Sequence, residues 1–208
     1  MTTWTMRRVI VSNVMSLDGF VSGPNGELDW FVYAGFVKGT EFGEYARTII
    51  SSVDAILLGR LTYEEFSSYW PTATDDDPVI TERMNNLPKF VFSRSLEQVA
   101  WGDWGTARLV REDSAAAVSK MRQEPGRDMV VYGSATLVSD LMKAGLIDEY
   151  QLLVYPVVLG QGRPEFKDLN ERYSLSLIDV KQLKSGAVKL IYLPLRQEKP
   201  RELSAPKP

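Results

Sequence analysis

The segment DMVVYGSATLVSDLMKAGLIDEYQLLVYPVV, residues 128–158, contains a strand, a helix and a second strand in succession. Asp128–Tyr132 is a short apolar run of the kind found in buried strands. Apolar residues at helical spacing then predict a helix over about Ser134–Lys143, which Gly145 ends. The apolar run Tyr150–Val158 predicts a longer strand. Two strands joined by a helix indicate an α/β fold with parallel neighbouring strands.

The same alternation extends on both sides of this segment. Strands are predicted at Val9–Met15, Phe20–Ser22, Asp54–Leu58, Lys89–Phe92 and Ala107–Val110. Helices are predicted at Thr40–Ser51, from about Thr62, and at Asp113–Glu124. A terminal hairpin is predicted from Tyr173–Lys184 and Ala187–Leu193, turning at Ser185-Gly186. Because no helix separates the last three strands, we expect them to be antiparallel additions at one edge of the sheet.

Length and composition limit the class of protein. The chain has 208 residues, 44% of them hydrophobic, and a net charge of −3. We expect one domain over residues 1–193 and a disordered tail over residues 194–208. The mild charge argues against binding to nucleic acid or to an anionic membrane, and no apolar run reaches the ~18 residues of a membrane span. The N-terminal sequence lacks the features of a signal peptide, so a cytoplasmic protein is expected.

The chain contains neither histidine nor cysteine. Their absence excludes disulfides, zinc sites with Cys or His ligands, cysteine nucleophiles and a Ser-His-Asp triad. Proton transfer would have to use Asp, Glu, Tyr, Lys, water or a cofactor, which favours an organic cofactor if the protein is an enzyme. Asp75-Asp76-Asp77 has no further ligand at a suitable spacing, so we predict a solvated loop there and no metal site.

The first of three candidate anion sites follows the strand Asp54–Leu58. Ligands of open α/β sheets bind beyond the carboxyl ends of the strands. Here Gly59 permits a tight turn and Arg60 supplies positive charge. Thr62, with Glu65 three residues later, would form a capping box at the start of a helix, where free backbone N–H groups attract anions. The alternative is a capped helix with a solvent-exposed arginine.

Two further strand ends have a similar character. In VFSRS, residues 91–95, Ser93 and Arg94 directly follow a strand and are suited to gripping a phosphate, although a surface loop is an alternative. In VVYGSATLVSDLM, residues 130–142, a strand, a glycine and small residues open a helix, without the G-x-G-x-x-G spacing of the usual dinucleotide fingerprint. Three such ends in one sheet would suit a ligand with several phosphates, such as a dinucleotide.

Candidate acids cluster in the first quarter of the chain. They are Asp18, Asp29, Glu41 and Glu44. Asp18 lies in a turn directly after the first strand, where a site should open, although an ordinary turn aspartate is an alternative. Trp30, with Phe31 beside it, would wall a pocket for a flat ring, unless both are simply core residues.

Four segments, taken in order, resemble a known family. They are SLDGF at residues 16–20, LLGRLTYEEF at 57–66, KFVFSRS at 89–95 and the long block from residue 130 to 166 that ends in LIDEYQLLVYPVVLGQGRPEF. Together they are similar to the C-terminal reductase domain of the bifunctional riboflavin-biosynthesis deaminase-reductase, over about residues 8–193. The resemblance implies a dihydrofolate reductase-like three-layer fold. Its sheet would be mixed, mostly parallel and eight-stranded, with helices on both faces and an antiparallel C-terminal edge.

The resemblance also implies roles for individual residues. NADPH would be bound by Val14, Gly19, Gly59, Arg60, Thr62, Ser93, Arg94, Gly133, Ser134, Ala135, Thr136 and Leu137. Within that set, Ser93 and Arg94 would meet the 2′-phosphate of the adenosine ribose. Asp18 matches a family position that lines the substrate site. We predict that Asp18 acts in catalysis and contacts the substrate together with Trp30, Glu44 and Tyr155.

The sequence departs from the family in ways that bear on function. Gly133-Ser134 stands where dihydrofolate reductases have two glycines, and the segment before Glu44 does not match theirs. We expect no zinc-dependent deaminase half, because its His and Cys ligands are missing from this sequence. We therefore predict a stand-alone NADPH-dependent reductase resembling 5-amino-6-(5-phosphoribosylamino)uracil reductase. A dihydrofolate or pteridine reductase and a non-catalytic NADPH-binding module are the alternatives. A homodimer is expected, because the terminal strands leave a sheet edge to be covered.

Overall fold

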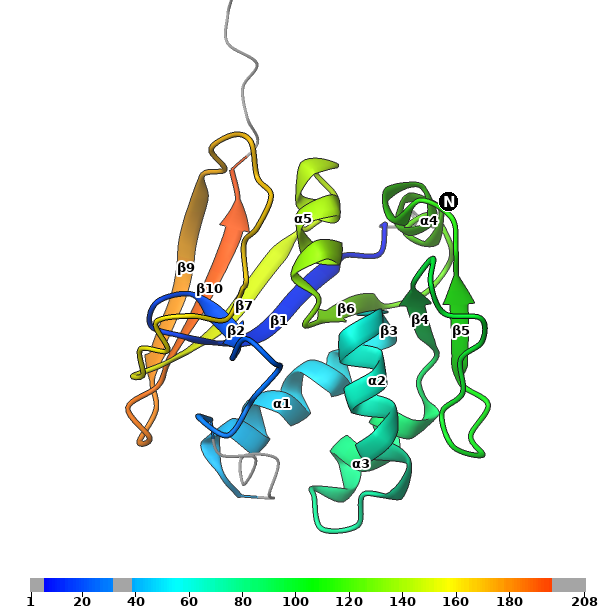
Figure 1. Ribbon diagram of the computed structural model, residues 1–208, viewed down its shortest axis with the longest axis horizontal. Coiled ribbons are helices and arrows are strands. Elements are labelled where there is room, and N and C mark those ends of the chain that lie inside the picture. The colour runs from blue at the N-terminus through cyan, green and yellow to red at the C-terminus, as the bar shows by residue number, and fades with distance from the viewer. Residues whose placement is uncertain (1–5, 32–38, 196–208) are drawn as a thin grey trace, which may run out of the picture.

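The computed structural model describes residues 6–31 and 39–195. Its central feature is an eight-stranded sheet (Figure 1), whose strands are β1 (Val9–Ser16), β3 (Val53–Gly59), β4 (Lys89–Phe92), β5 (Ala107–Val110), β6 (Asp128–Tyr132), β7 (Glu149–Tyr155), β9 (Leu175–Gln182) and β10 (Val188–Pro194). The strand order is β5-β4-β3-β6-β1-β7-β10-β9. Every pair from β5 to β7 is parallel, and β10 is antiparallel to both β7 and β9.

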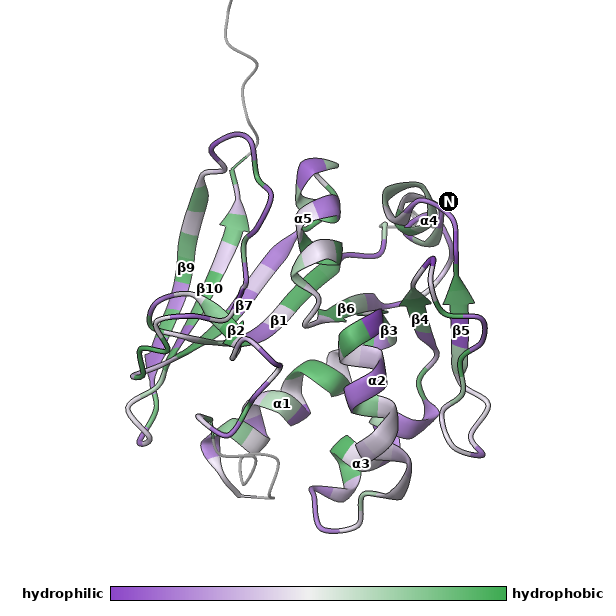
Figure 2. Ribbon diagram, viewed as in Figure 1, coloured by the Kyte–Doolittle hydropathy of each residue, from purple (hydrophilic) through white to green (hydrophobic). Residues whose placement is uncertain are grey.

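This architecture confirms the predicted α/β fold with a mixed, mostly parallel sheet and an antiparallel C-terminal edge. One detail of that prediction is wrong, because β7 pairs in parallel with β1. The helix between β6 and β7 carries the chain back across the sheet, so β7 starts from the same edge as the other parallel strands. The reversal of direction comes only afterwards, in the hairpin of β9 and β10, along which polar and apolar residues are interspersed (Figure 2).

Helices cover both faces of the sheet. Helices α1 (Glu41–Ser52), α2 (Arg60–Tyr69) and α3 (Pro78–Asn86) lie on one face, and α4 (Ser114–Met121) and α5 (Ala135–Lys143) lie on the other (Figure 1). A short 3-10 helix, η2 (Trp70–Thr72), follows α2. None of the helices in the described ranges is both long and apolar enough to cross a membrane.

Strand β3 shows why the sheet needs both helical layers. Ala55 and Leu57 face the core beneath α4 and α5, whereas Ile56 and Leu58 face the core that α1, α2 and α3 cover. All four side chains are buried. A strand that is buried on both faces has a nearly continuous apolar sequence, and this is why Asp54–Leu58 was identifiable as a strand.

Two expectations for the segment after β3 are wrong. Helix α2 begins at Arg60, with Gly59 as an N-cap that makes no side-chain capping bond. Thr62 therefore lies inside the first turn, and Thr62 and Glu65 do not form the predicted capping box. Helix α3 was not predicted at all; Asp77 caps it by accepting from the amide of Val79, and that aspartate is buried instead of solvated. Among the described residues, no cluster of acidic side chains could hold a metal ion.

Strand β7 ends earlier than the strand predicted from the sequence. Strand β7 ends at Tyr155, three residues before Val158. A loop then leads to β8 (Arg163–Pro164), which pairs with β2 (Phe20–Ser22) in a small second sheet. Strand β10 includes Pro194, the first residue of the expected disordered tail, and most of that tail, residues 196–208, lies outside the described ranges.

Candidate functional site

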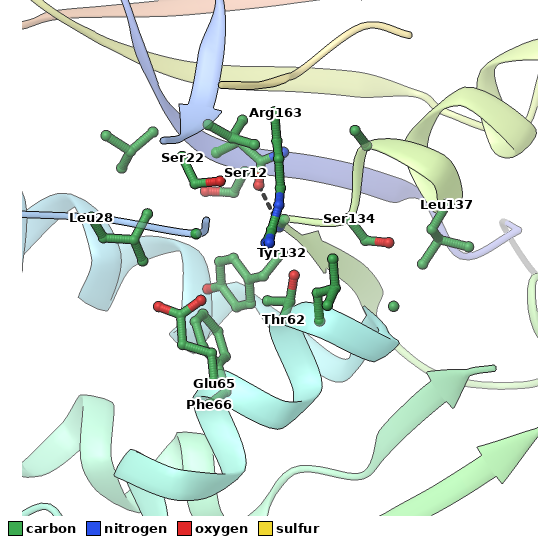
Figure 3. A pocket seen from close by; sticks show the side chains of 18 of the residues that line it. Ser12, Ser22, Leu28, Thr62, Glu65, Phe66, Tyr132, Ser134, Leu137 and Arg163 are labelled. Carbon is green, nitrogen blue, oxygen red and sulfur yellow. Dashed lines mark hydrogen bonds between the residues drawn. The ribbon is translucent and has the colours of Figure 1, made fainter. Parts of the chain in front are cut away.

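A cavity of about 580 Å³ opens at the carboxyl ends of the parallel strands. Its walls come from β1, from the turns that follow β3, β4 and β6, from helix α1, and from the β2–β8 sheet. Figure 3 shows the lining side chains of β1, β2, α2 and α5 among them. In parallel α/β sheets this edge is where ligands bind. The position therefore agrees with the expectation that the three strand ends form one site.

Two turns meet at the centre of this edge. A Cβ atom at Gly59 would lie 1.8 Å from Ser134 Oγ, and one at Gly133 would lie 2.3 Å from Thr62 Oγ1. Ser134 thus packs against the backbone of Gly59, and Thr62 packs against the backbone of Gly133. Gly59 has an extended backbone, so there the requirement is space alone, whereas Gly133 also has a φ of +57°. We call this pair of contacts the glycine clasp, formed by Gly59 with Ser134 and Gly133 with Thr62.

The start of α5 faces the cavity. Ser134, the N-cap residue, has a φ of 56° and makes no side-chain capping bond. Ala135, Thr136 and Leu137 follow it in the cavity wall. The first backbone N–H groups of a helix have no partner within the helix, and the helix dipole places partial positive charge there. This part of the cavity is thus suited to a phosphate or another anion.

A buried polar network supports the turn before α5. The amide of Gly133 donates to Asn13 Oδ1 at 2.6 Å, and Asn13 Nδ2 donates to Glu165 Oε1 and Oε2 at 2.9 and 2.7 Å. The Glu165 side chain is fully buried. Burial raises the pKa of Glu165 to about 7, and the hydrogen bond from Asn13 acts in the opposite direction.

Another part of the cavity wall is aromatic. Phe31, Phe42, Phe66, Tyr45 and Tyr132 all line it. The Tyr45 hydroxyl lies 3.0 Å from Ser12 Oγ. Burial raises the pKa of both tyrosines above the ordinary phenol value, so both phenols stay protonated at neutral pH. A flat, weakly polar ring system would fit this wall.

Charged side chains also contribute to the cavity lining. Arg60, Glu65, Asp140, Arg163 and Lys167 line the cavity. The Arg60 guanidinium pairs with Glu64 at 2.9 Å, and Lys167 pairs with Asp168 at 3.5 Å. Arg163 extends from β8 into the cavity between Ser22 and Ser134 (Figure 3).

Most of the predicted cofactor residues come together in this cavity. Its lining includes Val14, Gly59, Arg60, Thr62, Ser93, Gly133, Ser134, Ala135, Thr136 and Leu137. Gly19 and Arg94 do not line it, and Arg94 is exposed. Ser93 Oγ accepts hydrogen bonds from the amides of Ser95 and Leu96, which shapes the loop after β4.

The predicted substrate residues lie outside the cavity lining. Asp18 is exposed, and its carboxylate accepts hydrogen bonds from Ser16 Oγ and from the amides of Leu159 and Gly160. These bonds lower the pKa of Asp18, that from Ser16 most strongly. The geometry thus gives Asp18 a clear part in joining the β1–β2 turn to the loop after β7, and its catalytic role stays a prediction.

The remaining predicted substrate residues do not line the cavity either. Glu44 is exposed on α1. Trp30 and Tyr155 stack edge to face at 6.1 Å, and both pack against Phe31, which does line the cavity. Of the other acids considered, Glu41 accepts a hydrogen bond from the amide of Lys184, and Asp29 is exposed.

Several residues of the site were not identified from the sequence. Asn13, Glu165, Arg163 and Tyr132 belong to the cavity or to its buried support. Only Asn13 carried a usable signal, because an amide within the apolar run Val9–Met15 needs a buried hydrogen-bond partner. Arg163 belongs to the two-residue strand β8 and Glu165 directly follows it, in a segment whose local sequence does not indicate that these side chains reach the cavity or its support.

Comparison with known proteins agrees with this fold. Residues 7–189 match the model of the RibD C-terminal domain family, and the chain belongs to that family. The chain is 31% identical to the uncharacterized protein YyaP of Bacillus subtilis over 188 residues, which cover 89% of this chain and 94% of that protein. It is also 30% identical to the uncharacterized protein YwjB of the same organism, over 90% of this chain and 98% of that one.

Solved structures share the architecture. A putative riboflavin biosynthesis protein from Shewanella sp. PV-4 superposes with a TM-score of 0.70 at 24% identity, over 91% of this chain and 99% of that one. A deaminase/5-amino-6-(5-phosphoribosylamino)uracil reductase from Thermotoga maritima gives 0.66 at 12% identity, over 91% of this chain and 57% of that one. The predicted dihydrofolate reductase-like fold is thereby confirmed.

The glycine clasp gives a prediction for stability. In Gly59→Ala the new methyl group would overlap Ser134 Oγ, and overpacking of this kind costs about 1–3 kcal/mol. Replacing Ser134 with glycine removes the overlapping atoms, and the nearest remaining atom, the Cα of residue 134, would lie 3.8 Å from the new Cβ. Urea denaturation should therefore show Gly59→Ala destabilised and Gly59→Ala/Ser134→Gly largely restored.

The single variant Ser134→Gly is the matched control. Its left-handed backbone suits glycine, so it should be at least as stable as the wild type. A double variant as unstable as Gly59→Ala alone would show that the two turns do not meet in this way.

Proposed function

We propose that the protein is an NADPH-dependent reductase that acts on a small polar substrate. The single observation that carries the proposal is the joining of the β3–α2 and β6–α5 turns by the glycine clasp, at the edge of the sheet where the start of α5 faces the cavity. Close glycine backbones and free helical N–H groups are what a pyrophosphate requires. Membership of the RibD C-terminal domain family supports the same activity.

The residues of the cavity fit a dinucleotide. Ala135, Thr136 and Leu137 would bind the pyrophosphate through their backbone N–H groups, with Thr62 beside them. Val14, on β1, would contact the nicotinamide ring. Bound NADPH supplies the hydride. The chain would orient the ring with its aromatic wall. The accompanying proton would come from water or from Asp18 and not from Tyr45 or Tyr132, which hold their phenol protons too tightly.

An anionic group on the substrate would bind Arg163. The guanidinium lies in the cavity wall and forms no hydrogen bond or ion pair with any other described residue. Glu27 is near enough for the arginine charge to lower the pKa of that carboxyl. An arginine without a fixed partner can bind a phosphate through two parallel hydrogen bonds. This supports a phosphorylated substrate such as 5-amino-6-(5-phosphoribosylamino)uracil.

The alternative of folate reduction receives less support. Dihydrofolate reductases carry an acid on the first helix that reaches the substrate. Glu44 is exposed on α1 and does not line the cavity. The carboxylates that do line it, Glu65 and Asp140, come from α2 and α5 instead.

A homodimer would involve the outer strand of the sheet. Strand β9 lies at the sheet edge, and it exposes Leu177, Ile178 and Val180 to solvent. An edge strand with exposed apolar side chains favours association with a second chain. We therefore propose that the protein is a homodimer that covers this strand.

Cofactor preference tests the first part of the proposal. NADPH and NADH differ only in the 2′-phosphate, and Arg94 follows β4 at the cavity edge of the sheet. Arg94→Ala should weaken NADPH binding roughly 10- to 150-fold, corresponding to the loss of about 1.5–3 kcal/mol for an arginine–phosphate contact. NADH binding should barely change. Fluorescence titration of both cofactors would check this, and equal losses for both would contradict it.

Turnover tests the second part. NADPH oxidation followed by absorbance should be supported by 5-amino-6-(5-phosphoribosylamino)uracil and not by dihydrofolate. Arg163→Gln should raise KM at least tenfold for the phosphorylated substrate, because a charge-assisted bond of about 1.5 kcal/mol is lost. Its effect should disappear with the dephosphorylated analogue. The outcome against the proposal is tight NADPH binding without oxidation by either acceptor, which would indicate a binding module.

A further inference from the structure

We infer that Glu165 is a positioning residue: its ionised carboxylate orients the Asn13 side-chain amide, and Asn13 in turn fixes the Gly133 turn. The inference rests on the proposed function for its consequence, since that turn is where we place the cofactor pyrophosphate. Its structural part concerns the protein alone and can be tested without any cofactor.

Three short hydrogen bonds join the three residues. Asn13 Nδ2 lies 2.9 and 2.7 Å from the two Glu165 carboxylate oxygens, and Asn13 Oδ1 lies 2.6 Å from the Gly133 nitrogen. The Glu165 side chain is fully buried and Asn13 is 6% exposed. Water therefore competes little for these bonds, and the groups are satisfied mainly by one another.

The chemistry of an amide makes this arrangement directional. An ionised carboxylate only accepts hydrogen bonds, and a backbone N–H only donates them. Asn13 satisfies both neighbours in one orientation alone, with its NH₂ toward Glu165 and its oxygen toward Gly133. In the reversed orientation its NH₂ would oppose the Gly133 N–H and its oxygen would oppose the carboxylate.

Protonation of Glu165 removes this constraint. A neutral carboxyl group carries one O–H donor, which can bind the Asn13 oxygen and so permits the reversed orientation. The bond to Gly133 would then be lost. Because burial raises the pKa of Glu165 to about 7, both forms are populated near neutral pH.

Few other groups influence the ionisation of Glu165. In the described ranges Glu165 has no ion pair. Tyr150, on β7, is the titratable group that interacts with it electrostatically. Burial keeps Tyr150 protonated near neutral pH, so Tyr150 adds no charge. A pH-dependent change in this network between pH 5.5 and 8.5 is therefore due to the titration of Glu165.

Glu165 also connects two turns, the β1–β2 turn and the β6–α5 turn, of which the second lines the cavity. Its backbone amide donates to the carbonyl of Gly19 at 2.9 Å, in the β1–β2 turn. Its side chain reaches the β6–α5 turn through Asn13. A single residue thus joins the turn that contains Gly19, one of the predicted cofactor residues, to the turn at which we place the pyrophosphate.

Nuclear magnetic resonance of the cofactor-free protein tests the structural part. Between pH 5.5 and 8.5, the Gly133 backbone amide, the Asn13 side-chain NH₂ and the Glu165 carboxyl carbon should titrate with one common midpoint near 7. Glutamine does not ionise in this range and, like the protonated glutamate, offers Asn13 both a donor and an acceptor. In Glu165→Gln the Gly133 and Asn13 signals should therefore no longer titrate. A Gly133 signal that titrates equally in this variant would overturn the inference.

The chain offers a matched control. Glu149 is also a buried glutamate bonded to a side-chain amide, that of Gln151, and it lies at the start of β7, away from the cavity. Glu149→Gln should leave the titration of Gly133 unchanged. If Glu165→Gln does not fold, the wild-type titration still decides, because different midpoints for Glu165 and Gly133 would contradict the coupling.

Cofactor affinity tests the consequence. If only the ionised form holds the turn in place, about a tenth of the protein is competent at pH 6, and NADPH should bind about tenfold more weakly there than at pH 8. The 2′-phosphate of NADPH titrates in the same interval. The contribution of Glu165 is therefore the difference between the pH dependence of NADPH affinity in the wild type and that in Glu165→Gln, which should be weaker. Identical pH profiles would refute the consequence. If NADPH does not bind at all, the proposed function fails, whereas the resonance titration still decides the role of Glu165.

Discussion

The closeness of two backbone turns is the constraint on which the site depends. Strands β3 and β6 are neighbours in a parallel sheet, so the turns that follow them emerge side by side. A side chain at position 59 or 133 would hold the two turns apart. Glycine at positions 59 and 133 lets each turn accept a hydroxyl-bearing residue of the other, Ser134 and Thr62 respectively.

Other contacts extend this constraint across the sheet. Asn13 links β1 to the Gly133 turn, and Glu165 links Asn13 to the loop after β7. Asp18 ties the same loop to the β1–β2 turn through the amides of Leu159 and Gly160. Residues far apart in the chain thus define one binding edge. The strands supply the platform, and buried polar contacts set the shape of the loops above it.

The sequence allowed the platform to be predicted more completely than the site. Strands such as Asp54–Leu58 have a continuous apolar pattern because helices cover both faces, and glycines directly after strands marked two of the turns. Helix α3 escaped detection because its segment, PVITERMNN, has only a weak apolar face. Lys89 shows a similar limit: it is fully buried, and its ammonium donates to the Asn85 carbonyl and Thr106 Oγ1, partners that only the fold brings together.

The central claim is that the glycine clasp and the start of α5 form a dinucleotide site. The most direct measurement is the change in backbone amide resonances on addition of NADPH to the labelled protein. The account predicts saturable shifts concentrated in residues 59–62 and 133–137, with strands β9 and β10 unaffected. Shifts confined to other parts of the chain, or none at saturating NADPH, would contradict it.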